Sequence, residues 1–204
     1  MTDSKREYLK DHTSQYVSIG ISRGAKHVSS GWVPWHSTGN AFNMRIPNVF
    51  FDPEELEDPE IWEWLDTKRV NGCYIFCPLA DYSFLARLPH LQDITILHGD
   101  ALRDLHFLRE NREWFQLHVE GAVLENLDDL FPEGPRKGIH SYCVCLDGHT
   151  VKDISALTQP GIYLSELVIL EPEGSNDRAR WEVVRCGKYS YFEYRLPEGY
   201  GCTN

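Results

Sequence analysis

A seven-residue pattern occurs four times in the middle of this 204-residue chain. Its copies begin 23, 22 and 27 residues apart, and each holds an apolar or aromatic residue at its first, fourth and seventh positions. A recurring period of about 20–50 residues is typical of a solenoid, in which each repeat forms one coil and stacks on the next. We therefore expect stacked coils over the four copies, which are Leu79–Leu85, Leu102–Leu108, Leu124–Leu130 and Val151–Leu157.

The residue types within each copy predict a short, capped helical turn. Apolar residues spaced by three face the same side of a helix. The third position always carries a short polar side chain that can accept a hydrogen bond from a backbone N–H at a helix start, namely Asp81, Asp104, Asn126 and Asp153.

A run with the length and composition of a β-strand precedes each copy. Turns that contain glycine, which tolerates positive φ, follow three of these runs at Gly99, Gly121 and Gly148, whereas the first run is followed by Pro78. The four runs are Cys73–Cys77, Ile94–Leu97, Phe115–Val119 and Tyr142–Leu146, and a fifth strand is expected around Leu167–Ile169.

The register of the second predicted strand is open between two alternatives, because successive side chains of a strand point to opposite faces. The leucine spacing that leads into this strand points Ile94 and Ile96 toward the core. Counting back from Leu102 instead points Thr95 and Leu97 inward.

This pattern resembles the leucine-rich repeat family, and the copy at Val151–Leu157 is similar to the class of about 22 residues found in internalin-like bacterial proteins. The connecting run Leu85–Ile96 also has the family's three-residue leucine spacing. The resemblance covers about residues 70–170 and implies an α/β solenoid: a right-handed coil of about four to five repeats with a parallel sheet on its concave face. The family's turn asparagine is replaced here by Cys77, Asp100, Ala122 and His149, which indicates a short and degenerate solenoid.

Two flanks of different character are expected to cap the repeats, because a terminal coil otherwise leaves its apolar face in water. We expect a single domain, 1–204, made of an N-terminal capping flank at 1–69, the leucine-rich-repeat-like region at 70–170 and a C-terminal β flank at 171–204. In the C-terminal flank, residues 180–185 and 189–196 predict a β-hairpin.

The N-terminal flank is predicted to be mixed in structure. The pattern predicts strands at residues 16–21 and 41–46, with a Trp-rich loop at residues 31–36 between them. Asp52 and Asp58 each stand before a proline and predict the starts of two helical segments. The buried face of the second segment is expected to hold Ile61, Trp62 and Leu65.

Composition and charge exclude several classes of protein. A formal net charge of −11 argues against nucleic-acid binding and favours a basic partner. No apolar run is long enough to span a membrane, and the first ten residues lack the apolar stretch of a secretory signal, so we expect a cytoplasmic location. The spacing of the six cysteines resembles no disulfide framework, and they are expected to be buried or half-buried free thiols.

The concave strand face is the candidate binding surface, because side chains that alternate away from the core project from it side by side. If Leu117, Val119, Val144 and Leu146 point inward, the residues between them form this face. Neighbouring strands lie about 4.8 Å apart, so His118 and Cys145 are expected to be near neighbours. The predicted partner-binding residues are Gln116, His118, Glu120, Cys143, Cys145, Asp147, Glu166 and Val168.

The sequence therefore predicts a non-enzymatic module that binds another protein through this face, without a cofactor or metal and without contact to nucleic acid or membrane. An alternative is a small enzyme or ligand-binding protein with a Cys/His site between the Trp-rich loop and the concave face, using His36, His118 and Cys145. A thiolate nucleophile also needs an orienting group, and a zinc site needs three or four ligands, whereas the sequence supplies only the His118–Cys145 pair. A third possibility is self-association through the flanks.

Overall fold

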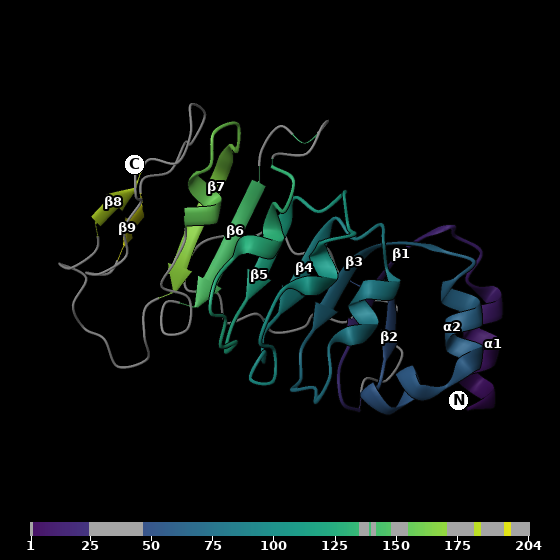
Figure 1. The fold of residues 1–204 in the computed structure, drawn as a ribbon. Coiled ribbons are helices and arrows are strands. Elements are labelled where there is room, and N and C mark those ends of the chain that lie inside the picture. Colours follow the sequence, from purple (N-terminus) through teal and green to yellow (C-terminus); the bar gives the residue numbers. More distant parts are fainter. Residues whose placement is uncertain are drawn as a thin grey trace. The chain divides into compact units, whose positions relative to one another are not determined.

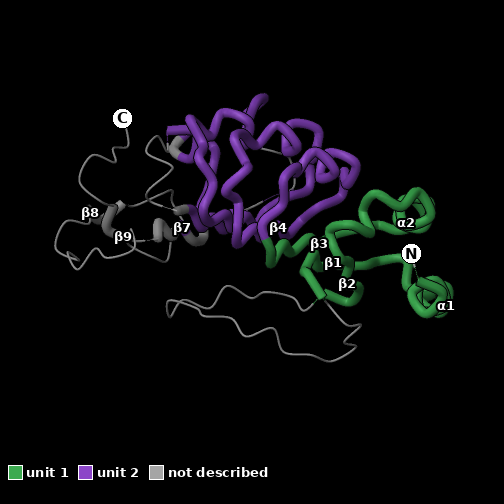
Figure 2. The backbone as a smooth tube through the Cα atoms, turned by 90° about the horizontal axis from the view of Figure 1, so that it is seen from below, with its two compact units in different colours: residues 1–77 green, residues 78–204 purple. Residues whose placement is uncertain are grey.

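The computed structural model divides the chain into two compact units, residues 1–77 and 78–204 (Figure 2). It describes residues 2–24, 47–134, 139, 142–147, 155–170, 182–184 and 194–196. Over these residues, no helix combines the length and the apolar character needed to cross a membrane. Both units contain parallel strands joined by short helices, which confirms the expected α/β class and the parallel sheet.

The described part of the first unit contains three strands and three short helices. In chain order they are α1 (Asp3–Asp11), β1 (Tyr16–Ile21), β2 (Val49–Phe51), the 3-10 helix η1 (Pro53–Glu57), α2 (Pro59–Leu65) and β3 (Arg69–Ile75). β1 pairs in parallel with both β2 and β3, and it confirms the strand predicted at residues 16–21 (Figure 1). β3 begins at Arg69, earlier than the predicted start at Cys73.

The two helical segments predicted after Asp52 and Asp58 are confirmed as η1 and α2. The Glu55 side chain accepts a hydrogen bond from the Asp52 backbone N–H at 3.0 Å, and Asp58 accepts one from the Glu60 backbone N–H at 2.9 Å. Both bonds satisfy N–H groups that the first turn of a helix leaves without a partner. The predicted buried face of α2 is also confirmed, with Ile61, Trp62 and Leu65 all buried.

The helix α1 was not predicted, because it has almost no apolar pattern. Its buried residues are Leu9 and, unusually, Lys5. The Lys5 ammonium donates to the Phe50 carbonyl and to Glu55 and lies over the Phe51 ring. Burial lowers the pKa of Lys5, against the opposing effect of Glu55. A lysine thus anchors this helix where a sequence pattern expects an apolar residue.

In the second unit, 3-10 turns alternate with the strands of a parallel sheet along the described part of the chain. The strands are β4 (Asp93–Ile96), β5 (Gln116–Val119), β6 (Tyr142–Asp147) and β7 (Leu164–Leu170), and the turns are η2 (Ser83–Arg87), η3 (His106–Leu108), η4 (Asp128–Leu130) and η5 (Ser155–Thr158). β4 pairs with β5, β5 with β6 and β6 with β7, so these four strands lie side by side in chain order (Figure 1). These strands confirm the predicted ones, including the fifth strand around Leu167–Ile169.

The capped turns predicted within the first three copies of the pattern are confirmed. In each copy the polar side chain accepts a hydrogen bond from the backbone N–H two residues later, at 2.8 Å for Asp81, 3.0 Å for Asp104 and 3.1 Å for Asn126. The apolar positions are buried, and Leu105 and Leu127 are each 1% exposed. In the fourth copy, residues 151–154 lie outside the described part of the chain.

The structure resolves the two registers that the sequence left open for β4. Ile94 pairs with Leu117 and Ile96 with Val119, and all four side chains are buried. Thr95 pairs with His118 and therefore shares the other face of the sheet. The leucine spacing predicted this register correctly, and the count back from Leu102 was wrong.

At the C-terminal end, β8 (Glu182–Val184) and β9 (Tyr194–Leu196) pair antiparallel, which confirms the two arms of the predicted hairpin. Three other predicted features of the flanks lie outside the described residues. They are the hairpin turn at 186–188, the Trp-rich loop at 31–36 and the strand at 41–46.

Replacing Leu127 with Ala is expected to lower the free energy of unfolding by about 2–5 kcal/mol, because it leaves a cavity among buried leucines. Chemical denaturation followed by circular dichroism measures the change. The matched control is Glu125→Ala, whose exposed side chain predicts a change within about 0.5 kcal/mol. A loss as small as the control's for Leu127→Ala would show that this leucine is not a core residue.

Candidate functional site

Backbone pairing in the second unit places the predicted binding residues in rows across the sheet. Gln116 of β5 pairs with Cys143 of β6, and His118 pairs with Cys145. Paired residues of adjacent parallel strands lie about 4.8 Å apart on the same face. The prediction that His118 and Cys145 occupy neighbouring positions is therefore confirmed.

β7 continues the same rows by one strand. Glu166 is the pairing partner of Cys143, and Val168 is the partner of Cys145. Asp147, at the end of β6, pairs with Leu170. The side chains of Asp147, Glu166 and Val168 lie outside what the structure describes, so their part in binding stays a prediction.

The expectation that this face is open to solvent is wrong for its central residues. Gln116 is 8% exposed, His118 is 2% exposed and Cys145 is 1% exposed. Cys143 is half-buried, and the side chain of Glu120 is 35% exposed. Alternation along a strand determines which face a side chain occupies, but it does not determine whether that face is covered. The sequence pattern therefore predicted correctly which residues share a row, but its prediction that the side chains of Gln116, His118 and Cys145 are exposed was wrong.

His118 and Glu120 form the best-defined polar contact of the site. His118 Nε2 lies 2.6 Å from Glu120 Oε1, within hydrogen-bond distance. The two residues are separated by one position, so they project from the same face of the chain. The imidazole donates from Nε2 in this contact, and its buried ring fixes the direction of a carboxylate that is itself partly exposed.

Glycine residues hold Glu120 at the end of β5. Gly121 follows it with φ of +74°, a left-handed conformation that favours glycine. The Gly99 backbone N–H donates to the Glu120 carbonyl at 2.8 Å. A Cβ atom at Gly99 would lie 2.9 Å from that carbonyl oxygen, so a larger residue would disturb the contact.

Two residues of β4 belong to the same face and were not among the predicted site residues. Asp93 pairs with Gln116, and Thr95 pairs with His118; both side chains are buried. Thr95 Oγ1 and Gln116 Nε2 have no hydrogen-bond partner among the described residues. The ambiguous register of β4 concealed Thr95, because one of its two alternatives pointed this residue into the apolar core.

The site combines a carboxylate, an imidazole and a thiol, but the thiol is closed to solvent. Glu120 supplies the third group that the sequence could not assign to the His118–Cys145 pair. At 1% exposure, Cys145 offers no route for a substrate in this conformation. His36, the third reactive group of the alternative site, lies outside the described residues.

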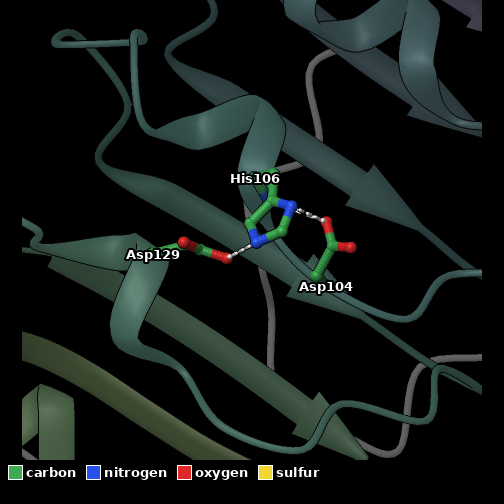
Figure 3. A group of neighbouring side chains, drawn as sticks. All are labelled: Asp104, His106 and Asp129. Atoms are coloured by element: carbon green, nitrogen blue, oxygen red, sulfur yellow. Dashed lines mark hydrogen bonds and ion pairs between the residues drawn. The ribbon is translucent and has the colours of Figure 1, made fainter.

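A second cluster, made of Asp104, His106 and Asp129, lies at the turns η3 and η4 (Figure 3). His106 Nδ1 lies 3.3 Å from Asp104, and its Nε2 lies 3.4 Å from Asp129. Arg109 Nε also donates to Asp129 at 2.5 Å.

These three side chains lie close enough together to consider a metal ion, but their arrangement suits an ion-pair network better. Asp104 faces Nδ1 of His106 and Asp129 faces Nε2, so the two carboxylates do not converge on one ring nitrogen (Figure 3). The carboxylate of Asp129 already forms an ion pair with the Arg109 guanidinium. Asp104 and His106 are exposed. The cluster links consecutive turns, because His106 and Arg109 both contact the buried carboxylate of Asp129.

The cysteines described by the structure behave as the sequence predicted. Cys73, Cys77 and Cys145 are buried, Cys143 is half-buried, and none of the four forms a disulfide. Burial raises the pKa of the Cys77 thiol above its ordinary value, which keeps it protonated at neutral pH. Cys186 and Cys202 lie outside the described residues.

Comparison of the chain with protein-family models, with curated proteins and with solved structures found no match.

Replacing His118 with Ala is expected to lower the free energy of unfolding by about 1–3 kcal/mol, because the change removes a buried ring and the hydrogen bond to Glu120. Chemical denaturation measures the loss. His98→Ala, which truncates an exposed histidine of the same unit, is the control and predicts a change within about 0.5 kcal/mol. Equal stabilities of the two variants would contradict the burial of His118.

Proposed function

We propose that this protein is a cytoplasmic, non-enzymatic module that binds a partner protein through the face formed by β4, β5, β6 and β7. We further propose that residues 70–170 form a short solenoid similar to leucine-rich repeats. Parallel strands that pair in chain order, together with the capped turns and buried leucines of the first three copies of the pattern, support this proposal. A cytoplasmic location agrees with the four described cysteines, which form no disulfides.

The observation that carries the binding proposal is the in-register alignment of polar residues on one face of the sheet. Gln116 and Cys143 lie in one row, and His118 and Cys145 in the next. Leu117 and Val144, which alternate with them along the strands, belong to the opposite face, so the polar residues are gathered on one face. Adjacent rows of fixed spacing make a rigid surface, which suits recognition of a folded partner.

The burial of this face identifies the residues that a partner would touch. Glu120 and Cys143 are the described members with exposed surface, whereas Gln116, His118 and Cys145 are buried. We therefore assign direct contact to Glu120 and Cys143, and we assign a positioning role to His118 through its hydrogen bond to Glu120.

Affinity capture from a lysate of the native host is expected to retain a partner on the tagged wild-type protein and to lose it on the double variant Glu120→Ala/Cys143→Ser. Both changes affect side chains with exposed surface, so the fold is expected to survive, as circular dichroism and thermal unfolding would establish. The control is Glu125→Ala, an exposed acidic residue outside the strands, which should keep the partner. A partner held equally by the double variant and the wild type would contradict the assigned face.

A second candidate function, a thiol enzyme, is favoured by one observation. Glu120 holds the imidazole of His118, which occupies the position next to Cys145. This is the order of groups that activates a cysteine nucleophile. The burial of Cys145 weighs against it, because a nucleophile has to reach its substrate.

Alkylation of the native protein near neutral pH separates the two candidates. If the protein is a binding module, Cys145 and Cys77 are both expected to react far more slowly than in the unfolded chain, because both are buried and the Cys77 thiol has a raised pKa. Mass spectrometry of peptides after timed treatment with iodoacetamide measures each site. Rapid modification of Cys145 while Cys77 stays intact would overturn the non-enzymatic assignment.

A further inference from the structure

The two ends of α1 are held by different kinds of contact. Near its start, the buried ammonium of Lys5 anchors the helix. At its end, the Trp64 indole N–H of α2 donates to the Leu9 carbonyl at 3.0 Å. The Lys68 ammonium donates to the His12 carbonyl, also at 3.0 Å. The last turn of α1 is therefore attached to α2 and the residues after it through backbone carbonyls.

The imidazole of His12, the residue that ends α1, packs at this attachment. Its ring centroid lies 6.0 Å from that of Tyr8 in α1 and 6.1 Å from that of Trp64 in α2. His12 Nε2 is buried and has no hydrogen-bond partner among the described residues. A neutral imidazole leaves one nitrogen without a proton, whereas the charged ring has an N–H on both. Protonation of the attached ring would therefore bury an N–H that has no acceptor, which is costly.

The charged group that acts on this ring is itself a cation. The Lys68 ammonium lies 5.1 Å from the centroid of the Trp64 ring, and its charge disfavours a second positive charge on His12. A cation at the end of a helix is usually favourable, but here Lys68 already donates to the terminal carbonyl. Tyr8 is neutral, because burial raises its pKa, and the exposed Asp11 does not bond Nε2. Burial and the charge of Lys68 together lower the pKa of His12.

We infer that the contact between the end of α1 and α2 is a pH switch, in which protonation of His12 detaches the last turn of the helix. This inference concerns the first unit and does not depend on the proposed binding face. Detachment would break the bond between Trp64 and the Leu9 carbonyl and expose the Leu9 side chain, which is 3% exposed when α1 is attached.

The direction of the switch follows from the two states of the ring. A detached imidazole is in water and titrates near its ordinary pKa of about 6.5. The attached ring binds a proton less readily, because its pKa is lowered. Attachment is therefore fully favoured above about pH 6.5, and it weakens as the pH falls from that value through the lowered pKa.

A nuclear magnetic resonance titration of the full chain from about pH 7.5 to about pH 5 follows both events. The Cε1–H signal of His12 reports protonation. The indole Nε1–H signal of Trp64, assigned by its absence in Trp64→Phe, reports the bond to Leu9. The two signals are expected to move together with a single midpoint below about pH 6.5. A Trp64 indole signal that stays constant over this range would overturn the inference.

Two variants separate the charge of His12 from a general effect of acid. His12→Gln has a polar side chain that cannot gain a proton, and it is expected to keep the Trp64 signal constant over the whole range. The control is His98→Gln, which changes an exposed histidine of the second unit and should keep the wild-type transition. A transition of the Trp64 signal in His12→Gln that matches the wild type would contradict the switch.

Lys68→Met tests the part played by the neighbouring cation. It removes the ammonium group and keeps an apolar chain next to the Trp64 ring. The midpoint of the His12 signal is expected to rise, because the like charge that opposes protonation is gone. Circular dichroism at neutral pH would establish that each variant is folded. A midpoint in Lys68→Met at or below that of the wild type would also overturn the inference.

Discussion

The pairing register of β4, β5 and β6 is the constraint on which the other features of the second unit depend. Ile94, Leu117 and Val144 form one row across these strands, and Thr95, His118 and Cys145 form the next. A shift of one residue in any strand would move its apolar side chains to the polar face. The leucines of the turns and the isoleucines and valines of these strands are buried, and a buried apolar face strongly specifies the pairing register.

Most of this arrangement could be predicted from the sequence because its causes are local. The spacing of the repeated pattern, the short polar side chains at its third position and the glycine at residue 121 each determine a turn within a few residues. The features that could not be predicted depend on distant contacts. Lys5 is buried in α1 because Phe50 and Glu55 meet its ammonium, and no property of the helix alone indicates that.

The candidate site shows the same division between local and distant causes. Alternation placed His118 beside Cys145 and on the same face as Glu120, as the structure confirms. It did not predict that His118 and Cys145 are buried, because burial depends on what lies over the face. This difference changes the functional interpretation. The imidazole becomes a support for Glu120, which directly follows β5 and has a partly exposed carboxylate.

Cross-strand nuclear Overhauser contacts between backbone protons of β4, β5 and β6 would establish the strand register. With the register described above, these contacts join His118 to Thr95 on one side and to Cys145 on the other. Contacts displaced by one residue, to Val144 or Leu146, would contradict it. Such a shift would place His118 opposite apolar neighbours and separate the polar row on which the proposed binding face depends.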